Sequence, residues 1–305
     1  MMVRSLRPAD VLPLLFFLSN SPANEAKVRG RLCDAGSKAG PILPLLVGCF
    51  VSQRRQRSIV QADGGAVRGL VCLRSCRAPI AWEIERLLLA HGHEGCCVSL
   101  LEMPGSAGDA LKAGWIYLRL DSTSQALAMA RQAGFSQYLT EHLYRLDEGP
   151  RPEPKASSLV ARAKQAADER AIFRLYSAAV PLPVRRVEGM TFEEWLGKRE
   201  CGAFRELVVE DKGESVGWLR LRLDRSAGEF HLMTAREGAS LDEMVDVSLT
   251  LLGGRKATYC LVAEFQSQLR RALEERGFRQ VVEYSCLSRQ LVVPVREPQL
   301  VPLGA

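Results

Sequence analysis

The sequence lacks the paired cysteines of disulfide-stabilised and zinc-binding proteins. Its nine cysteines are odd in number and scattered, and no two of them have the spacing Cys-x-x-Cys. Cys72, Cys260 and Cys286 lie in apolar stretches, where a free thiol behaves as a small apolar side chain. This pattern predicts a reducing, cytoplasmic compartment and excludes a disulfide framework.

Histidine is also scarce, with four residues in the whole chain. His91, His93 and His142 have no partner at the spacing of metal ligands. We therefore expect these three side chains at the surface, and no metal site.

Long apolar runs are absent as well. The run at residues 11–18 is far shorter than the roughly 20 residues that a membrane-spanning helix needs, and no clear small-residue cleavage site of a signal peptide follows it. The sequence therefore predicts no membrane association.

The charge of the chain is modest and dispersed, with a net value of +6 and 25% charged residues. The densest basic group is formed by Arg54, Arg55 and Arg57. We interpret it as a solvated strand entry or loop, with nucleic-acid binding as the less favoured alternative. With 47% apolar residues the chain can bury a core, and 305 residues fit two domains of average size.

One stretch, residues 114–146, shows a complete local pattern. An apolar run at residues 115–120 predicts a strand, a helix with a broad apolar face follows, Gly134 ends that helix, and Phe135 leads into a second strand at residues 138–146. This sequence therefore predicts a strand, helix, tight turn and strand.

The same pattern occurs a second time. Gly277 and Phe278 correspond to Gly134 and Phe135, and both halves contain helices, three strands, a helix, a strand, a helix and a final strand region. The proline-rich stretch at residues 149–158 is the best linker candidate. We predict two copies of one α/β domain, at residues 1–148 and 159–305.

This order of elements, together with the pattern Ala126-x7-Gly134-Phe135 and its counterpart Gly277-Phe278, resembles the GNAT superfamily of acetyl-CoA-dependent N-acetyltransferases in a tandem arrangement. The resemblance implies two tandem α/β domains, each with a mixed, mostly antiparallel sheet flanked by helices. It also implies acetyl-CoA as co-substrate. The pantetheine arm is expected where the fourth strand separates from the fifth, and the pyrophosphate at the start of the next helix, where free N–H groups favour phosphate.

In the first copy, the resemblance places this cofactor site at the end of the strand at residues 81–89 and in the loop that follows. The residues expected to bind there are Leu88, Leu89, His93, Gly95, Cys96 and Cys97. In the second copy, Arg236 and Gly238 occupy the corresponding loop, at a different spacing from the family's.

Four titratable residues are candidates for the general base that an N-acetyltransferase needs to deprotonate the attacking amine. Glu83 and Glu85 share one face of a strand, and Glu229 and His231 do the same at the corresponding place in the second copy. The alternative interpretation is that all four are solvated on an open face of the sheet.

The proton donor that is common in this family, a tyrosine four residues before the Gly-Phe pair, is missing from both copies. Ala130 and Leu273 stand there. The sequence thus leaves two functions open. One is an N-acetyltransferase that acts on an amine of a small molecule or a protein. The other is a catalytically degenerate GNAT-like protein that binds a ligand or partner.

Overall fold

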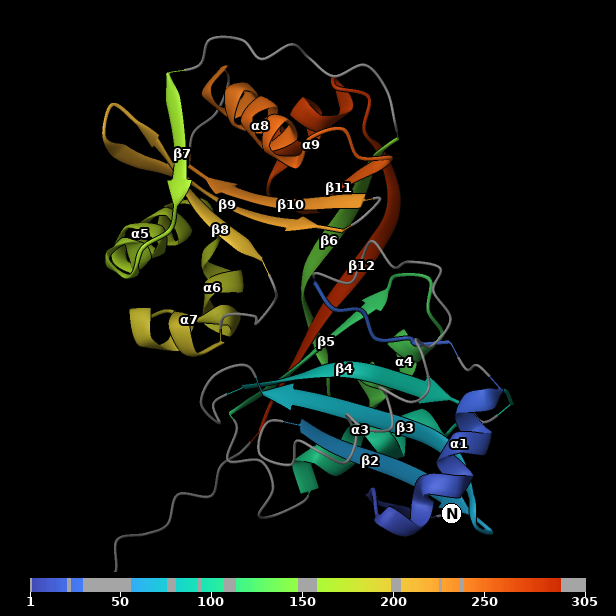
Figure 1. Cartoon of the computed structure of the whole chain (residues 1–305). Coiled ribbons are helices and arrows are strands. Elements are labelled where there is room, and N and C mark those ends of the chain that lie inside the picture. Colours follow the sequence, from blue (N-terminus) through green and yellow to red (C-terminus); the bar gives the residue numbers. More distant parts are fainter. Residues whose placement is uncertain are drawn as a thin grey trace, which may run out of the picture.

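The computed structural model of the chain describes residues 2–20, 23–29, 56–75, 81–92, 95–106, 114–147, 158–198, 204–224, 227–235 and 239–291. Its two halves repeat one order of helices and strands (Figure 1). The first half contains β1 (Met2–Ser5), η1 (Pro8–Asp10), α1 (Val11–Ser19), β2 (Gln56–Asp63), β3 (Ala66–Ser75), β4 (Ala81–Leu89), α3 (Cys96–Ser106), β5 (Trp115–Asp121), α4 (Ala126–Gln132) and β6 (Ser136–Asp147). The second half contains β7 (Leu159–Ala163), η3 (Ala166–Asp168), α5 (Glu169–Ala179), α6 (Leu182–Glu188), α7 (Phe192–Lys198), β8 (Arg205–Asp211), β9 (Glu214–Leu223), β10 (Ala227–Thr234), α8 (Ala239–Leu252), β11 (Ala257–Ala263), α9 (Ser267–Glu274) and β12 (Arg279–Gln290).

All the strands join one sheet, in the order β1-β2-β3-β4-β5-β12-β6-β11-β10-β9-β8-β7. The pairs β4/β5 and β10/β11 are parallel and the other pairs are antiparallel. The expectation of a mixed, mostly antiparallel sheet with flanking helices is confirmed.

The last strand of each half pairs with strands of the other half. β12, from the second half, lies between β5 and β6, and β6, from the first half, pairs with β11. Figure 1 shows β6 and β12 running together through the middle of the molecule. Within the described residues each half ends in a single long strand, β6 or β12. The domain limits stay a prediction, because the linker at residues 149–157 lies outside the described part of the chain.

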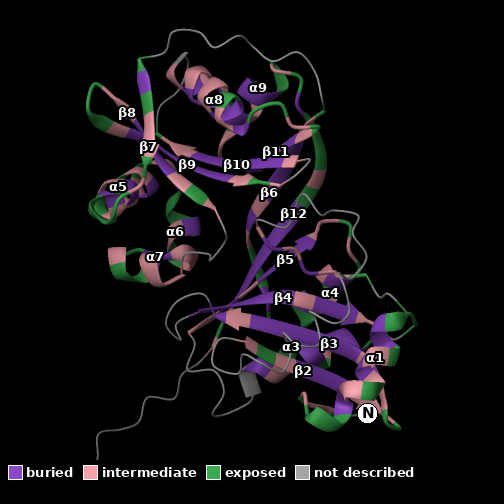
Figure 2. Cartoon of the chain, in the orientation of Figure 1, coloured by how far each residue is buried: buried purple, intermediate pink, exposed green. Residues whose placement is uncertain are grey.

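Each half packs one face of its strands against two helices. In the first half α3 and α4 cover a core that contains Ile84, Leu100 and Leu118. In the second half α8 and α9 cover the corresponding core, and Figure 2 shows buried residues concentrated along the strands of both halves. The duplication thus extends from the order of the elements to the packing.

The turn after the short helix is the same in both copies. Gly134 and Gly277 both have φ of +83°, a backbone conformation that costs side-chain-bearing residues free energy. The N–H of Phe135 then donates to the carbonyl of Ala130, and that of Phe278 to the carbonyl of Leu273. Ala130 and Leu273, at the family's tyrosine position, are fully buried, so both have a packing role.

A second repeated motif marks the start of each half. Arg4 donates two hydrogen bonds to Asp10, and Asp10 accepts the N–H of Arg7. Arg162 and Asp168 repeat this arrangement with the same six-residue spacing. A buried carboxylate thereby connects each first strand to the helical turn that follows it.

Candidate functional site

The two parallel strands of the first half separate after a short paired stretch. β4 and β5 pair only from Ala81 to Glu83 and from Trp115 to Tyr117. Beyond that point β4 follows β3 and β5 follows β12, so a gap opens between them. This is the splayed arrangement expected at the cofactor groove.

The gap in the first half is filled by the chain itself. Asn24 forms a bridge with Leu88 of β4, and Ala26 forms one with Leu120 of β5. We call residues 23–29 the inserted segment. The N–H of Glu25 donates to Leu87 O at 3.0 Å, and the N–H of Lys27 donates to Arg119 O at 2.9 Å.

The side chain of Asn24 completes this pairing. Its Nδ2 donates to Glu85 O at 3.3 Å, and its Oδ1 accepts the N–H of Leu87 at 2.9 Å. The backbone groups of β4 that an amide-containing pantetheine arm would need are thus already hydrogen-bonded. The first copy does not fit a pantetheine arm in this gap.

The residues expected to bind the cofactor in the first copy have mixed surroundings. Leu88, Cys96 and Cys97 are buried, Leu89 is half-buried, and Gly95 is exposed just before α3. Burial also raises the pKa of Cys97 to about 12, so its thiol stays neutral. His93 lies outside the described residues.

In the second half one side chain, that of Gln266, crosses the corresponding gap within the described part of the chain. β10 and β11 pair from Ala227 to Phe230 and from Ala257 to Cys260, and then separate. Gln266 Nε2 donates to Leu232 O at 3.0 Å, and its Oε1 accepts the N–H of Ala263 at 3.1 Å. A rotation of this one side chain would release both strands, so the second copy fits a pantetheine arm. The loop with Arg236 and Gly238 lies outside the described residues.

The strand register places the four predicted base candidates at equivalent positions. Glu83 pairs with Tyr117, as Glu229 does with Tyr259, and Glu85 and His231 each lie two residues further on. All four residues are 8% exposed or less. The interpretation that they are solvated on an open face is therefore wrong.

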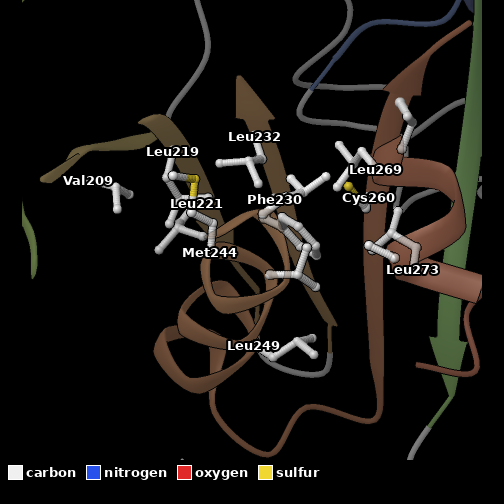
Figure 3. Packing of buried hydrophobic residues seen from close by; sticks show 14 of the residues in the cluster. Val209, Leu219, Leu221, Phe230, Leu232, Met244, Leu249, Cys260, Leu269 and Leu273 are labelled. Atoms are coloured by element: carbon white, nitrogen blue, oxygen red, sulfur yellow. The ribbon is translucent and has the colours of Figure 1, made fainter. Parts of the chain in front are cut away.

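Alternation along β10 determines which way these side chains point. Phe230 and Leu232 pack into the core with Met244 and Leu273 under α8 and α9 (Figure 3). Glu229 and His231 therefore lie on the opposite face.

Glu229 and His231 form a hydrogen-bonded pair. His231 Nε2 lies 2.8 Å from Glu229 Oε1. The Phe204 ring packs edge-on against the imidazole, and the two ring centres are 5.1 Å apart. Burial lowers the pKa of His231, its hydrogen bond to Glu229 opposes this shift, and the nearby charges of Arg220 and Arg29 favour it. When neutral His231 donates Nε2–H to Glu229, Nδ1 carries the free lone pair and can accept a proton.

A cavity of about 160 Å³ lies between the two halves, and His231 is part of its wall. It is bordered by β4 and β5, by the exchanged strands β6 and β12, by β9 to β11, and by the helices of the second half. Aromatic residues form much of this wall: Trp82, Tyr117, Tyr138, Tyr176, Trp195, Trp218 and Phe265. The exchange of strands thus builds one cavity from both copies.

A buried ion network occupies the first-half side of this cavity. Glu141 pairs with Arg29 and with Arg119, and Glu83 lies 3.4 Å from Arg74 and 3.9 Å from Arg119. Burial disfavours the charge of Glu141, but the two guanidinium groups outweigh it and hold its pKa well below the usual range.

The sequence did not predict Arg29, Arg119 or Glu141 as residues of this cavity. A signal was present for two of them, because Arg119 and Glu141 are charged residues inside otherwise apolar strands. Arg29 does not lie inside an apolar strand, so its sequence surroundings do not mark it in this way.

Two surface expectations have different outcomes. His91 is exposed as expected, whereas His142 is buried in β6, between neighbouring strands of the sheet.

Of the basic group predicted at a strand entry or loop, Arg57 is exposed at the start of β2, and Arg54 and Arg55 lie outside the described residues. Among the described residues no group of histidine, cysteine and carboxylate side chains could hold a metal ion, and none of the described helices is long and apolar enough to cross a membrane.

Comparison with protein-family profiles and with curated proteins gives no match. Solved structures do match. A GCN5-related N-acetyltransferase from Sphaerobacter thermophilus has a TM-score of 0.56 and 16% identity, covering 95% of both chains. A tandem GNAT protein from the clavulanic acid biosynthesis pathway has a TM-score of 0.51 and 13% identity, covering 95% of this chain and 98% of that one.

A GCN5-related N-acetyltransferase from Anabaena variabilis has a TM-score of 0.51 and 12% identity, covering 95% of this chain and 72% of that one. The chain has the fold of the GNAT superfamily, in a tandem arrangement.

Proposed function

We propose that this protein is an N-acetyltransferase with one working site, in its second copy, that transfers the acetyl group of acetyl-CoA to the amine of a small molecule. The observation that carries the proposal is the difference between the two gaps. The first is filled by the inserted segment, whereas among the described residues the second is crossed only by the side chain of Gln266. The second gap also borders the cavity that contains His231.

Glu229 and His231 have the geometry of a positioned general base. The carboxylate fixes the imidazole through a 2.8 Å hydrogen bond, which leaves Nδ1 to take a proton from the acceptor's ammonium group. Burial keeps the imidazole neutral at physiological pH. Acetyl-CoA, when bound, supplies the acetyl group as an activated thioester.

The position of the cavity supports a small-molecule acceptor rather than a protein chain. A volume of about 160 Å³ between the two halves is close to that of a cavity of about 150 Å³ that holds benzene. A folded protein would have to insert its amine between the two halves to reach His231.

A second function, binding without turnover, is favoured by the apolar residues at the family's proton-donor position. Ala130 and Leu273 are fully buried and cannot donate a proton. A protein that only binds acetyl-CoA or another ligand would not need a donor there.

A CoA-release assay with a panel of small amines separates these functions when it is combined with acetyl-CoA calorimetry. We expect acetyl-CoA binding and CoA release in the wild-type protein. His231→Gln should keep the binding and lower kcat/KM about 100-fold or more, the range for loss of a general base. Glu229→Gln, which removes the charge that holds the imidazole, should give a smaller loss.

Three results would contradict this account in different ways. Binding without CoA release for every amine would support the second function. Loss of activity in Glu85→Gln but not in His231→Gln would put the chemistry in the first copy. No binding at millimolar acetyl-CoA would exclude the enzyme.

A further inference from the structure

The inserted segment ends inside the cavity that contains His231. After its backbone has passed between β4 and β5, its last described residue, Arg29, reaches the cavity wall and pairs with Glu141 of β6. The first copy therefore fills its own gap and at the same time supplies a guanidinium group to the cavity bordered by the second copy.

Positive charge predominates around this cavity. Among the described residues that line it, five cationic side chains accompany three carboxylates. The cations are Arg29, Arg74, Arg119, Lys198 and Arg220, and the carboxylates are Glu83, Glu141 and Glu188. A cavity with this excess favours a ligand that carries negative charge.

Two of these cations lie close to the proposed base. Arg220 is held by the rings of Trp218 and Phe204, with its Cζ 4.8 Å and 5.2 Å from the two ring centres. His231 lies opposite Arg220 in the β9/β10 strand pair, and Arg29 lines the same cavity as these two residues. A guanidinium group presents paired N–H donors that match the two oxygens of a carboxylate.

We infer that the acceptor is a small amino carboxylate, and that Arg29 and Arg220 bind its carboxylate while its amine lies at His231. This inference rests on the proposed function, and it names the substrate class of the same site. Each functional group of the acceptor has a matching group in the cavity wall. His231 is the base for the ammonium group, and the guanidinium groups of Arg29 and Arg220 bind the carboxylate. A cavity volume of about 160 Å³ suits an acceptor of about the size of a benzene ring with its substituents.

The test measures binding separately from turnover. Calorimetry without acetyl-CoA compares β-alanine, 4-aminobutanoate and phenylalanine with the amines that lack the carboxylate, which are ethylamine, propylamine and phenethylamine. Wild-type protein should bind at least one amino carboxylate about tenfold or more tightly than its matched amine. Phosphoethanolamine is included, and a preference for it would overturn the assignment to a carboxylate.

Variants assign the carboxylate-binding residues. Arg29→Gln should weaken amino carboxylate binding by about ten- to a hundredfold, the range for a charge-assisted hydrogen bond, and leave amine binding unchanged. Arg29→Lys should restore part of the affinity. Lys27→Gln is the matched control, because Lys27 lies on the same segment but its Nζ donates to Asn24 O and it does not line the cavity.

Arg220→Gln tests the other half of the site and does not touch the inserted segment, so it decides the question if Arg29→Gln fails to fold. The inference is overturned if wild-type protein binds matched amines as tightly as amino carboxylates, or if neither arginine variant weakens carboxylate binding. Arginine-dependent carboxylate binding without CoA release would keep this inference and exclude the proposed enzyme. CoA release with amino carboxylates that neither arginine variant changes would keep the proposed enzyme and exclude this inference.

Discussion

At the scale of single residues, the pair formed by Glu229 and His231 depends on burial. An exposed histidine would be partly protonated near its ordinary pKa of about 6.5, and a protonated imidazole cannot act as a base. The surrounding rings and the charges of Arg220 and Arg29 extend the neutral form to lower pH. The carboxylate of Glu229 limits that extension and orients the ring.

This environment gives His231 a defined pH dependence. Because its folded pKa is lowered, the acidic limb of the kcat/KM profile should fall below pH 6.5. The unfolded chain also binds this proton more readily, so His231 stabilises the fold above pH 6.5 and that contribution is lost as pH falls towards the folded pKa. In His231→Gln, denaturant unfolding between pH 5 and 8 should lose this part of its pH dependence. An acidic limb above pH 6.5 in the wild-type protein would contradict the assignment.

The two glycines of the repeated turn give a paired prediction. Gly134→Ala and Gly277→Ala should each lower the free energy of unfolding by about 1–2 kcal/mol, the cost of a left-handed residue that carries Cβ. The added Cβ meets no atom closer than 3.7 Å at either position, so strain and not collision sets the cost. Urea unfolding measures both variants, and a cost above about 3 kcal/mol at only one position would show that the two turns are not equivalent.

At the scale of elements, the local unit was predictable and its partners were not. The strand, helix, Gly-Phe turn and strand follow from short-range signals, because a glycine at positive φ and an apolar helix face lie within a few residues of one another. The spacing of Arg4 to Asp10 and of Arg162 to Asp168 also repeats in the sequence and indicates where both copies begin.

The exchange of β6 and β12 has no such local signal. Each strand alternates side chains in the same way whichever neighbour it pairs with, so the sequence does not distinguish pairing within a half from pairing between halves. The burial of Glu229 and His231 has no local signal in the sequence either. The inserted segment is short and polar at Asn24, Glu25 and Lys27, which gives no strand pattern.

The contrast between the two gaps predicts the effect of Gln266→Ala. In the wild-type protein the two hydrogen bonds of this side chain must break before a pantetheine arm can pair with β10, at about 0.5–1.5 kcal/mol each. The variant should bind acetyl-CoA about tenfold more tightly by calorimetry. Weaker binding would show instead that Gln266 contacts the cofactor directly.

At the scale of the whole molecule, the exchanged strands make the two copies depend on each other. β12 pairs with both β5 and β6, and β6 pairs with β11, so neither copy completes its sheet with its own residues. The cavity with His231 likewise takes its wall from both copies. The duplication has therefore produced one site with two different contributors, and not two independent sites.

Separate expression of residues 1–148 and 159–305 tests this dependence. Each half alone should be unfolded or aggregated, because its last strand lacks the neighbours that bury it. Co-expression should restore a folded complex of one copy of each half, as judged by circular dichroism and size-exclusion chromatography. Two halves that fold separately and do not associate would contradict the importance of the exchange.

The central claim is that acetyl-CoA binds in the second copy and is excluded from the first by the inserted segment. Hydrogen–deuterium exchange with and without saturating acetyl-CoA tests it most directly, because it reports both binding and its location. The account predicts that added protection is confined to residues 231–234 and 261–266, while residues 23–29 and 84–89 exchange as in the free protein. Added protection at residues 84–89, with displacement of residues 23–29, would contradict it.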